Sequence, residues 1–273
     1  MSRPEKNSTM PRHHILITGA SSGIGAALAE YYARPGVHLT LWGRSEERLG
    51  KTASAVRAKG ASVDIFSIDL TQADEALKAL AYTDDQLPID ILILSAGMAD
   101  IRPHGALAES AETALRMSMV NFATPVAMAT EMANRMAARR HGRIALMGSV
   151  ASFHDLPLAT VYSGSKAGLG RFSTALQAAM TPHNVRVCLI APGFVDTPMS
   201  QRLDGEQAFL VPVEKAARKI ARSINQGRGV LVFPWVFQLT RLLEMVLPRP
   251  IAHRILRRLD VMQHPEHEKT AHQ

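Results

Sequence analysis

Thr18-Gly19-Ala20-Ser21-Ser22-Gly23-Ile24-Gly25 joins a short apolar run, residues 15–17, to a helix-forming segment. A strand, a tight glycine turn and a helix N-terminus in this order indicate a turn that binds the phosphates of a dinucleotide. We expect Gly19 to permit the sharp turn, Gly23 to let the backbone approach a pyrophosphate, and Gly25 to let the helix pack closely. Unpaired N–H groups and the helix dipole favour an anion there. A glycine-rich turn alone is a weak signal, and an ordinary turn is the alternative.

Apolar runs bounded by turn residues alternate with helical periodicity along the whole chain. The runs are nearly continuous in apolar residues, as expected for parallel strands that are covered on both faces. We expect strands at 14–17, 37–42, 62–68, 89–94, 142–147, 185–190 and 229–233. We expect helices at about 24–33, 45–59, 71–82, 106–139, 161–181 and 213–225. The alternation predicts an α/β fold, a Rossmann-type doubly wound parallel sheet of about seven strands with helices on both faces.

Composition and organisation favour one catalytic domain. The chain has 273 residues, of which 47% are apolar and 20% charged, as is ordinary for a globular protein. We assign residues 1–12 to a flexible tail, 13–233 to a dinucleotide-binding domain, 234–262 to an amphipathic helical extension of it, and 263–273 to a second flexible tail. Within the domain, the stretch 110–140 predicts the longest helix, which Pro125 could bend.

Charge and cysteine content restrict the partners and the compartment. The net charge of +7 fits either a solvated basic surface or an anionic partner. Because arginine-rich tracts with interleaved aromatic residues are absent from the sequence, nucleic-acid binding is not expected. The first residues lack the apolar segment of a secretory signal. The single cysteine, Cys188, lies in a strand-like run and is expected to be an inert core residue. These features predict a cytoplasmic protein.

The end of the second strand-like run indicates which dinucleotide is bound. It reads Leu41-Trp42-Gly43-Arg44-Ser45, and it contains no acidic residue that could bind the ribose 2′-hydroxyl of NAD. Gly43 leaves space, and the Arg44 guanidinium suits a phosphate. We therefore predict NADP(H) in preference to NAD(H). The alternative is that Arg44 is a solvated charge before a helix.

A tyrosine, a lysine and a serine make up the candidate catalytic group. Tyr162 and Lys166 are separated by one helical turn and share a helix face. A free tyrosine has a pKa of about 10, which a nearby ammonium group lowers. Ser149 follows the strand-like run 142–147, so it lies at the carboxyl edge of the sheet, where its hydroxyl can bond to a carbonyl oxygen that gains negative charge. Because tyrosine–lysine pairs at this spacing are common on helix surfaces, the pair alone decides nothing.

Taken together, these motifs resemble the short-chain dehydrogenase/reductases of the compact single-domain type. The resemblance covers about residues 13–233 and rests on Thr18-Gly19-x-x-x-Gly23-x-Gly25, Ser149, Tyr162-x-x-x-Lys166 and Pro192-Gly193. It implies an NAD(P)-dependent enzyme acting on CH–OH and C=O groups without a metal.

The resemblance also implies roles for individual residues. Tyr162 would be the general acid in reduction and the base in oxidation, Lys166 would lower its pKa and bind the nicotinamide ribose, and Ser149 would polarise the substrate carbonyl. Asn121 would hold a water that links Lys166 to solvent. The implied cofactor-binding residues are Gly19, Ser21, Ser22, Gly23, Ile24, Gly25, Arg44, Asp69, Leu70, Ser95, Ala96, Gly97, Tyr162, Lys166, Pro192, Gly193 and Thr197.

The sequence departs from the family pattern after the fourth strand. The family usually has Asn-Asn-Ala-Gly, where this chain has Leu94-Ser95-Ala96-Gly97. Ser95 can still form a hydrogen bond, so we expect altered local packing without loss of function. A second departure is Ala191, where the family often has asparagine. The alternative for the whole set is a noncatalytic dinucleotide-binding sensor on the same fold.

The sequence alone leaves several alternatives for the placement of the C-terminal segment and for the oligomeric state. Apolar residues from Trp235 to Leu247 fall on one helical face, and a second amphipathic segment starts at Ile251. The extension could pack on its own domain or on a partner subunit, cover an apolar substrate pocket, or contact a membrane surface peripherally. The family resemblance suggests a homodimer or homotetramer. The substrate is a small carbonyl or alcohol compound, and the leucine and phenylalanine residues around 153–158 hint that it is apolar.

Overall fold

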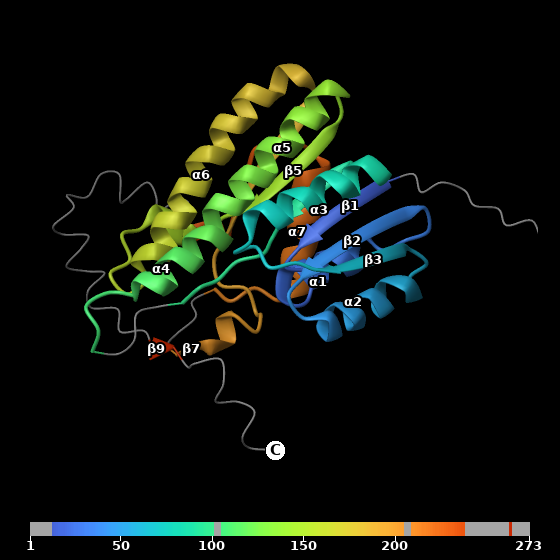
Figure 1. Cartoon of the computed structure of the whole chain (residues 1–273). Coiled ribbons are helices and arrows are strands. Elements are labelled where there is room, and N and C mark those ends of the chain that lie inside the picture. The colour runs from blue at the N-terminus through green and yellow to red at the C-terminus, as the bar shows by residue number, and fades with distance from the viewer. Residues whose placement is uncertain (1–12, 101–104, 205–208, 238–261, 264–273) are drawn as a thin grey trace, which may run out of the picture.

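The computed structural model describes residues 13–100, 105–204, 209–237 and 262–263. Seven strands form one parallel sheet in the order β3-β2-β1-β4-β5-β6-β8 (Figure 1). Their bounds are β1 His13–Thr18, β2 Val37–Gly43, β3 Ser62–Ser67, β4 Ile91–Leu94, β5 Gly142–Met147, β6 Val185–Pro192 and β8 Val230–Phe233. The predicted doubly wound sheet of seven strands is confirmed. Strand order reverses between β1 and β4, which creates the crevice where such sheets bind ligands.

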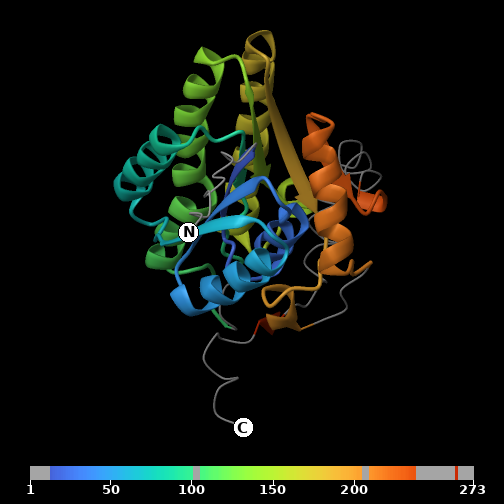
Figure 2. The same ribbon diagram turned by 90° about the vertical axis from the view of Figure 1, so that its right-hand side faces the viewer.

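Helices cover both faces of the sheet, as Figures 1 and 2 show. Side chains alternate along β1, so that Ile15 and Ile17 join one apolar cluster and Leu16 joins the other. The first cluster includes residues of α1 (Gly23–Tyr32), α2 (Glu46–Ala58) and α7 (Val213–Asn225). The second includes residues of α3 (Ala73–Gln86), α5 (Thr124–Ala138) and α6 (Thr160–Met180). Two buried layers therefore hold the sheet between them.

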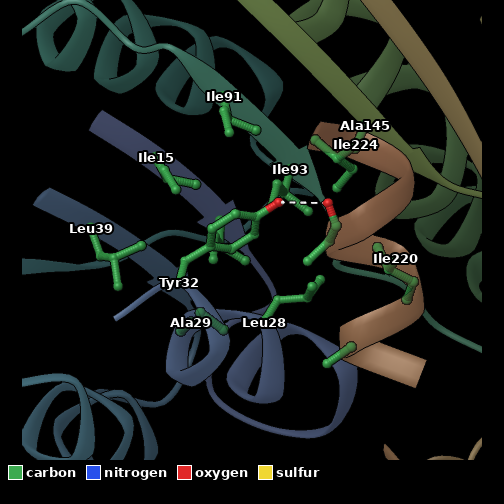
Figure 3. Packing of buried hydrophobic residues seen from close by; sticks show 14 of the residues in the cluster. Ile15, Leu28, Ala29, Tyr32, Leu39, Ile91, Ile93, Ala145, Ile220 and Ile224 are labelled. Carbon is green, nitrogen blue, oxygen red and sulfur yellow. Dashed lines mark hydrogen bonds between the residues drawn. The ribbon is translucent and has the colours of Figure 1, made fainter. Parts of the chain in front are cut away.

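Tyr32 joins α1 to α7 within the first cluster. Its ring packs among Ile15, Leu28 and Ile93, and its hydroxyl donates to the carbonyl oxygen of Ala221 at 3.5 Å (Figure 3). Burial raises the pKa of this hydroxyl. The same hydroxyl lies 3.4 Å from the side-chain oxygen of Asn225, also in α7, so the neutral phenol serves here as a packed side chain with a polar end that links two helices.

The helix expected over 106–139 is divided. Helix α4 (Ala111–Ser118) passes into a wider π turn, Met119–Ala123, and α5 begins at Thr124. Pro125 lies in the first turn of α5, directly after the π turn. The irregularity that was expected at Pro125 therefore occurs just before it, and the hydroxyl of Thr124 fixes the junction by donating to the carbonyl oxygen of Leu70 at 2.7 Å.

The end of the chain is described only in part. Trp235 to Phe237 follow β8, and β9 (Met262–Gln263) pairs antiparallel with β7 (Leu203–Asp204). The first predicted tail, residues 238–261 of the predicted helical extension and residues 264–273 of the second predicted tail lie outside the described residues. Within the described part of the chain, no helix is both long and apolar enough to span a membrane.

Two buried polar side chains illustrate how the core is completed. Cys188 is buried, its sulfur lies 3.6 Å from the Ser223 hydroxyl oxygen, and burial raises the pKa of its thiol, which suits the inert role expected for it. His14 is buried in β1. One ring nitrogen lies 2.7 Å from the carbonyl oxygen of Leu87, and the other lies 2.8 Å from the hydroxyl oxygen of Thr40. Burial lowers the pKa of His14 below the usual 6.5.

The buried His14 predicts a pH dependence of stability. A depressed folded-state pKa means that the unfolded chain binds more protons, so the free energy of unfolding falls as pH drops below about 6.5. In His14→Gln this fall should be shallower, whereas His183→Gln, a change at an exposed histidine, should keep the wild-type slope. Urea unfolding between pH 7.5 and 5 measures both slopes. Equal slopes in the two variants would contradict the prediction.

Candidate functional site

The glycine turn is held against the backbone that follows β4. Gly19 has a φ of +69°, and a Cβ atom added there would lie 2.7 Å from the Cα atom of Ala96. A Cβ atom on Gly25 would collide with the carbonyl oxygen of Gly19. Both positions therefore need glycine, the first for its conformation as well as for contact across the crevice and the second for the fit of α1 against the turn.

The start of α1 is open to an anion. Ser22 is the N-cap residue, but within the described structure its side chain makes no capping hydrogen bond, and the first turn of the helix contains no acidic residue. Ser21 and Ile24 flank it, half-buried, and Thr197 covers the turn with its methyl group 3.3 Å from an added Cβ atom on Gly23. Unsatisfied N–H groups at a helix start favour phosphate, so the turn fits the pyrophosphate of a dinucleotide.

Ser95 takes over the link between the ends of β1 and β4. Its hydroxyl donates to the carbonyl oxygen of Thr18, while the Ala96 N–H group donates to the Thr18 hydroxyl at 3.2 Å. The hydrogen bond expected of Ser95 is therefore present. These two bonds fix the strand ends whose glycines, Gly19 and Gly97, face the crevice.

Asn121 occupies the π turn and is fully buried. Its side-chain oxygen accepts from the N–H group of Met98 at 2.8 Å, and its side-chain nitrogen donates to the carbonyl oxygen of Met98, also at 2.8 Å. The same nitrogen lies 3.4 Å from the Ser165 hydroxyl oxygen. Asn121 thus connects the segment after β4 to the helix that carries Tyr162 and Lys166, and π turns are frequent at functional sites.

The structure brings Ser149, Tyr162 and Lys166 together at the carboxyl edge of β5. Ser149 is buried, and its hydroxyl accepts from the Ala151 N–H group at 3.1 Å. The nitrogen of Lys166 donates to the carbonyl oxygen of Met147 at 2.8 Å and lies 5.9 Å from the centre of the Tyr162 ring. The three side chains therefore surround one corner of the crevice.

Burial opposes the charged forms of both Tyr162 and Lys166. It raises the pKa of the Tyr162 phenol, and a hydrogen bond with the Ser149 side chain partly offsets this. It lowers the pKa of Lys166 to about 8. The sequence led us to expect a tyrosine made acidic by its lysine. Desolvation is the larger effect in the structure, so the phenol stays protonated at neutral pH.

Glu109 is a contributor that the sequence did not reveal. Helix α6 starts without a capping side chain at Ala159, and Glu109 supplies one from a distant loop. Its carboxylate accepts from the Thr160 hydroxyl at 2.8 Å and from the Val161 N–H group at 3.2 Å. These bonds fix the start of the helix immediately before Tyr162, and the negative charge of the carboxylate interacts favourably with the helix dipole. The contact joins residues that are far apart in the chain, so no local pattern could have indicated it.

Arg44, Asp69 and Leu70 follow the carboxyl ends of β2 and β3. Arg44 is exposed, and within the described residues its guanidinium forms no ion pair or hydrogen bond. At Gly43, next to Arg44, there is little space for a side chain, because an added Cβ atom would lie 3.2 Å from the Ser21 side chain. Asp69 accepts from the Thr71 N–H group at 2.9 Å, and Leu70 is buried. Arg44 and Asp69 therefore lie along the crevice at a different point from Tyr162.

The segment after β6 lies at the same carboxyl edge of the sheet. Pro192 ends the strand, and the N–H group of Gly193 donates to the carbonyl oxygen of Phe233 at 2.8 Å. A Cβ atom on Gly193 would lie 2.5 Å from the Phe237 ring. Thr197 then places this segment over the glycine turn. Within the described residues, no group of three or more His, Cys, Asp or Glu side chains could hold a metal ion.

Comparison with known proteins gives one consistent result. A family model described as short chain dehydrogenase matches residues 13–208. An uncharacterized oxidoreductase of Myxococcus xanthus is 29% identical over 245 residues, covering 89% of this chain and 96% of that protein. Another, from Staphylococcus saprophyticus, is 34% identical over 209 residues, covering 75% of this chain and 88% of that protein.

Solved structures agree with the sequence relatives. A short-chain dehydrogenase from Sphingobium yanoikuyae in complex with NADPH matches with a TM-score of 0.77 and 25% identity, over 93% of this chain and 99% of that one. A bulky-bulky ketone specific alcohol dehydrogenase from Comamonas testosteroni matches with a TM-score of 0.73 and 26% identity, over 88% of this chain and 96% of that one. The likeness extends over nearly the full length of both.

The two hydrogen bonds between Asn121 and Met98 predict a strong effect of an isosteric change on stability. Asn121→Asp replaces the donor that faces the Met98 carbonyl oxygen with an acceptor, in a fully buried position. We expect the free energy of unfolding to fall by about 1–3 kcal/mol, the cost of a buried polar group without its partner. Asn134→Asp, on the exposed face of α5, is the matched control and should change little. Denaturant unfolding measures both, and equal losses would disprove the role of Asn121.

Proposed function

The chain belongs to the short-chain dehydrogenase/reductase family of oxidoreductases, and on this premise we propose that it reduces a ketone or aldehyde, or oxidises the corresponding alcohol, with NADP(H). The observation that carries the proposal is the meeting of Ser149, Tyr162 and Lys166 at the crevice edge, next to the glycine turn. A bound dihydronicotinamide would supply the hydride. The protein side chains would orient the carbonyl and exchange the proton.

Each of the three side chains suits one part of this task. The Ser149 hydroxyl, held in place by the Ala151 N–H group, would donate to the carbonyl oxygen as negative charge develops. The Tyr162 phenol would give its proton to the same oxygen. Lys166 would bind hydroxyl groups of the nicotinamide ribose and, as a cation, stabilise the phenolate that remains.

The pKa directions favour a defined resting state. Because burial raises the pKa of Tyr162, the phenol keeps its proton at neutral pH, which is the form that reduction requires. Lys166, with a pKa lowered to about 8, is still mainly charged at pH 7. Reduction would therefore start from this state without prior proton movement, whereas oxidation must first remove a proton from a phenol whose pKa is raised.

Arg44 supports the preference for NADP(H). Its side chain is exposed directly after β2, beside Gly43, and its guanidinium has no partner within the described structure. Such a group can form a charge-assisted pair with a ribose 2′-phosphate. The related structure from Sphingobium yanoikuyae, which is in complex with NADPH, is consistent with this choice.

Aromatic and apolar side chains near the site bear on the substrate and on the assembly. Phe209 and Phe237 meet edge to face at 6.5 Å beside Gly193, which favours an apolar carbonyl compound. We also propose a homo-oligomer that is built on α4 to α6, where Leu115 is 67% exposed on α4. Burying such a side chain against a second subunit would stabilise the assembly.

Replacing the phenol oxygen tests the catalytic proposal. Tyr162→Phe should bind NADPH as well as the wild type and lose a factor of about 10²–10⁴ in turnover, the usual contribution of a general acid. Tyr82→Phe removes the hydroxyl of an exposed tyrosine and should leave turnover unchanged. NADPH oxidation with a panel of aldehydes and ketones gives the rates. Tight NADPH binding with no turnover by the wild type across that panel would favour the noncatalytic sensor instead.

A single arginine should set the cofactor preference. A charge-assisted hydrogen bond contributes roughly 1.5–3 kcal/mol, so Arg44→Gln should weaken NADPH binding about tenfold to a hundredfold and leave NADH binding nearly unchanged. Arg171→Gln, an exposed arginine on α6, removes the same charge elsewhere. Fluorescence titration gives the dissociation constants. A wild type that prefers NADH, or an equal loss in both variants, would overturn the assignment.

A further inference from the structure

Two arginines lie side by side at the amino edge of the sheet, opposite the crevice. Arg143 near the start of β5 and Arg186 near the start of β6 are register partners. Side chains alternate along strands, so both point to the same face as Ala145 and Cys188, the face that α1 and α7 cover. Two like charges directly opposite each other are destabilising unless something compensates them.

The described chain supplies no such compensation. Neither the Arg143 nor the Arg186 side chain forms an ion pair or hydrogen bond with the described residues, and the Nε atom of Arg143 is buried without a partner. Asp90, whose backbone carbonyl oxygen accepts from the Arg143 N–H group at 2.9 Å, has its carboxylate occupied by other groups. It accepts the N–H group of His14 at 2.8 Å and lies 3.2 Å from the His141 ring. Buried polar atoms nearly always have a partner in folded proteins, and the Arg143 Nε atom is an exception. Within the described residues, the arginine pair therefore lacks a counter-ion.

A small hollow opens at this place. Its volume is about 110 Å³, and it is lined by His141, Gly142, Arg143, Asn184 and Arg186. This is room for several water molecules or for one small oxyanion. Arg186 and His141 are exposed, so the hollow can be reached from solvent. It lies a full strand length, roughly 15–20 Å, from the glycine turn, and it is therefore separate from the candidate active site.

We propose that this hollow, the arginine hollow, binds a small oxyanion of the phosphate class. Each guanidinium offers a planar fork of N–H donors that matches the oxygens of a phosphate group. Two forks on neighbouring strands would share one dianion, which removes their mutual repulsion and gives the buried donor a partner. Free phosphate and a phosphate monoester offer the same group.

Titration with inorganic phosphate tests the proposal. The full chain is followed by thermal unfolding at constant ionic strength, with chloride as the exchange anion. We expect a saturable rise of the unfolding midpoint with phosphate in the wild type and an apparent affinity at least tenfold weaker in Arg186→Gln. Arg143→Lys, which keeps the charge but loses the fork, should also weaken it. Arg171→Gln, at an exposed position on α6, should titrate like the wild type.

Two further arms separate this site from others. Arg44→Gln should keep the phosphate response, because the dinucleotide crevice lies at the opposite edge. In chloride alone, Arg186→Gln should unfold at the wild-type midpoint or above it, since one of two repelling charges is gone. Glycerol 3-phosphate in place of phosphate distinguishes a monoester ligand, if it binds more tightly, from the free ion. Identical phosphate titrations of Arg186→Gln and Arg171→Gln would overturn the proposal.

Discussion

The site depends on a backbone contact between two strand ends. The glycine turn after β1 touches the chain after β4, and a single added carbon at Gly19 would separate them. The serine at position 95 ties the same two ends by donating to the carbonyl oxygen of Thr18. Because strand order reverses between β1 and β4, this contact sets the width of the crevice in which a dinucleotide would lie. The remaining site residues are arranged around it.

The buried side chain of Lys166 connects the turn after β4 to the part of the crevice where Tyr162 lies. Its nitrogen is anchored on the Met147 carbonyl oxygen, at the end of β5, and an added Cβ atom on Gly97 would lie only 3.4 Å from it. A charge in such a place is costly, which is why its pKa falls toward neutrality. Burying this group costs free energy, but it fixes the lysine within reach of both the tyrosine ring and the turn after β4.

Much of this arrangement follows from local sequence, and the rest does not. Strands such as β5 were predicted to the residue because parallel strands covered on both faces are continuous apolar runs. The glycine turn and the pair Tyr162 and Lys166 follow from spacing. The π turn at Asn121 does not, because a hydrogen bond to Met98 stabilises it. Glu109 at the start of α6 and the pairing of Arg143 with Arg186 likewise depend on contacts and register that only the folded chain creates.

The π turn also changes the rotation of one helix relative to the next. An α-helix advances about 100° per residue, so one extra residue in a turn shifts every later side chain around the axis. Before the turn, α4 buries only Met117, whereas α5 must aim Met128, Met132 and Met136 at the sheet. The widened turn lets α5 keep a methionine stripe aligned with the strands while the buried position of α4, Met117, is set independently. The two helices therefore need not share one continuous apolar stripe.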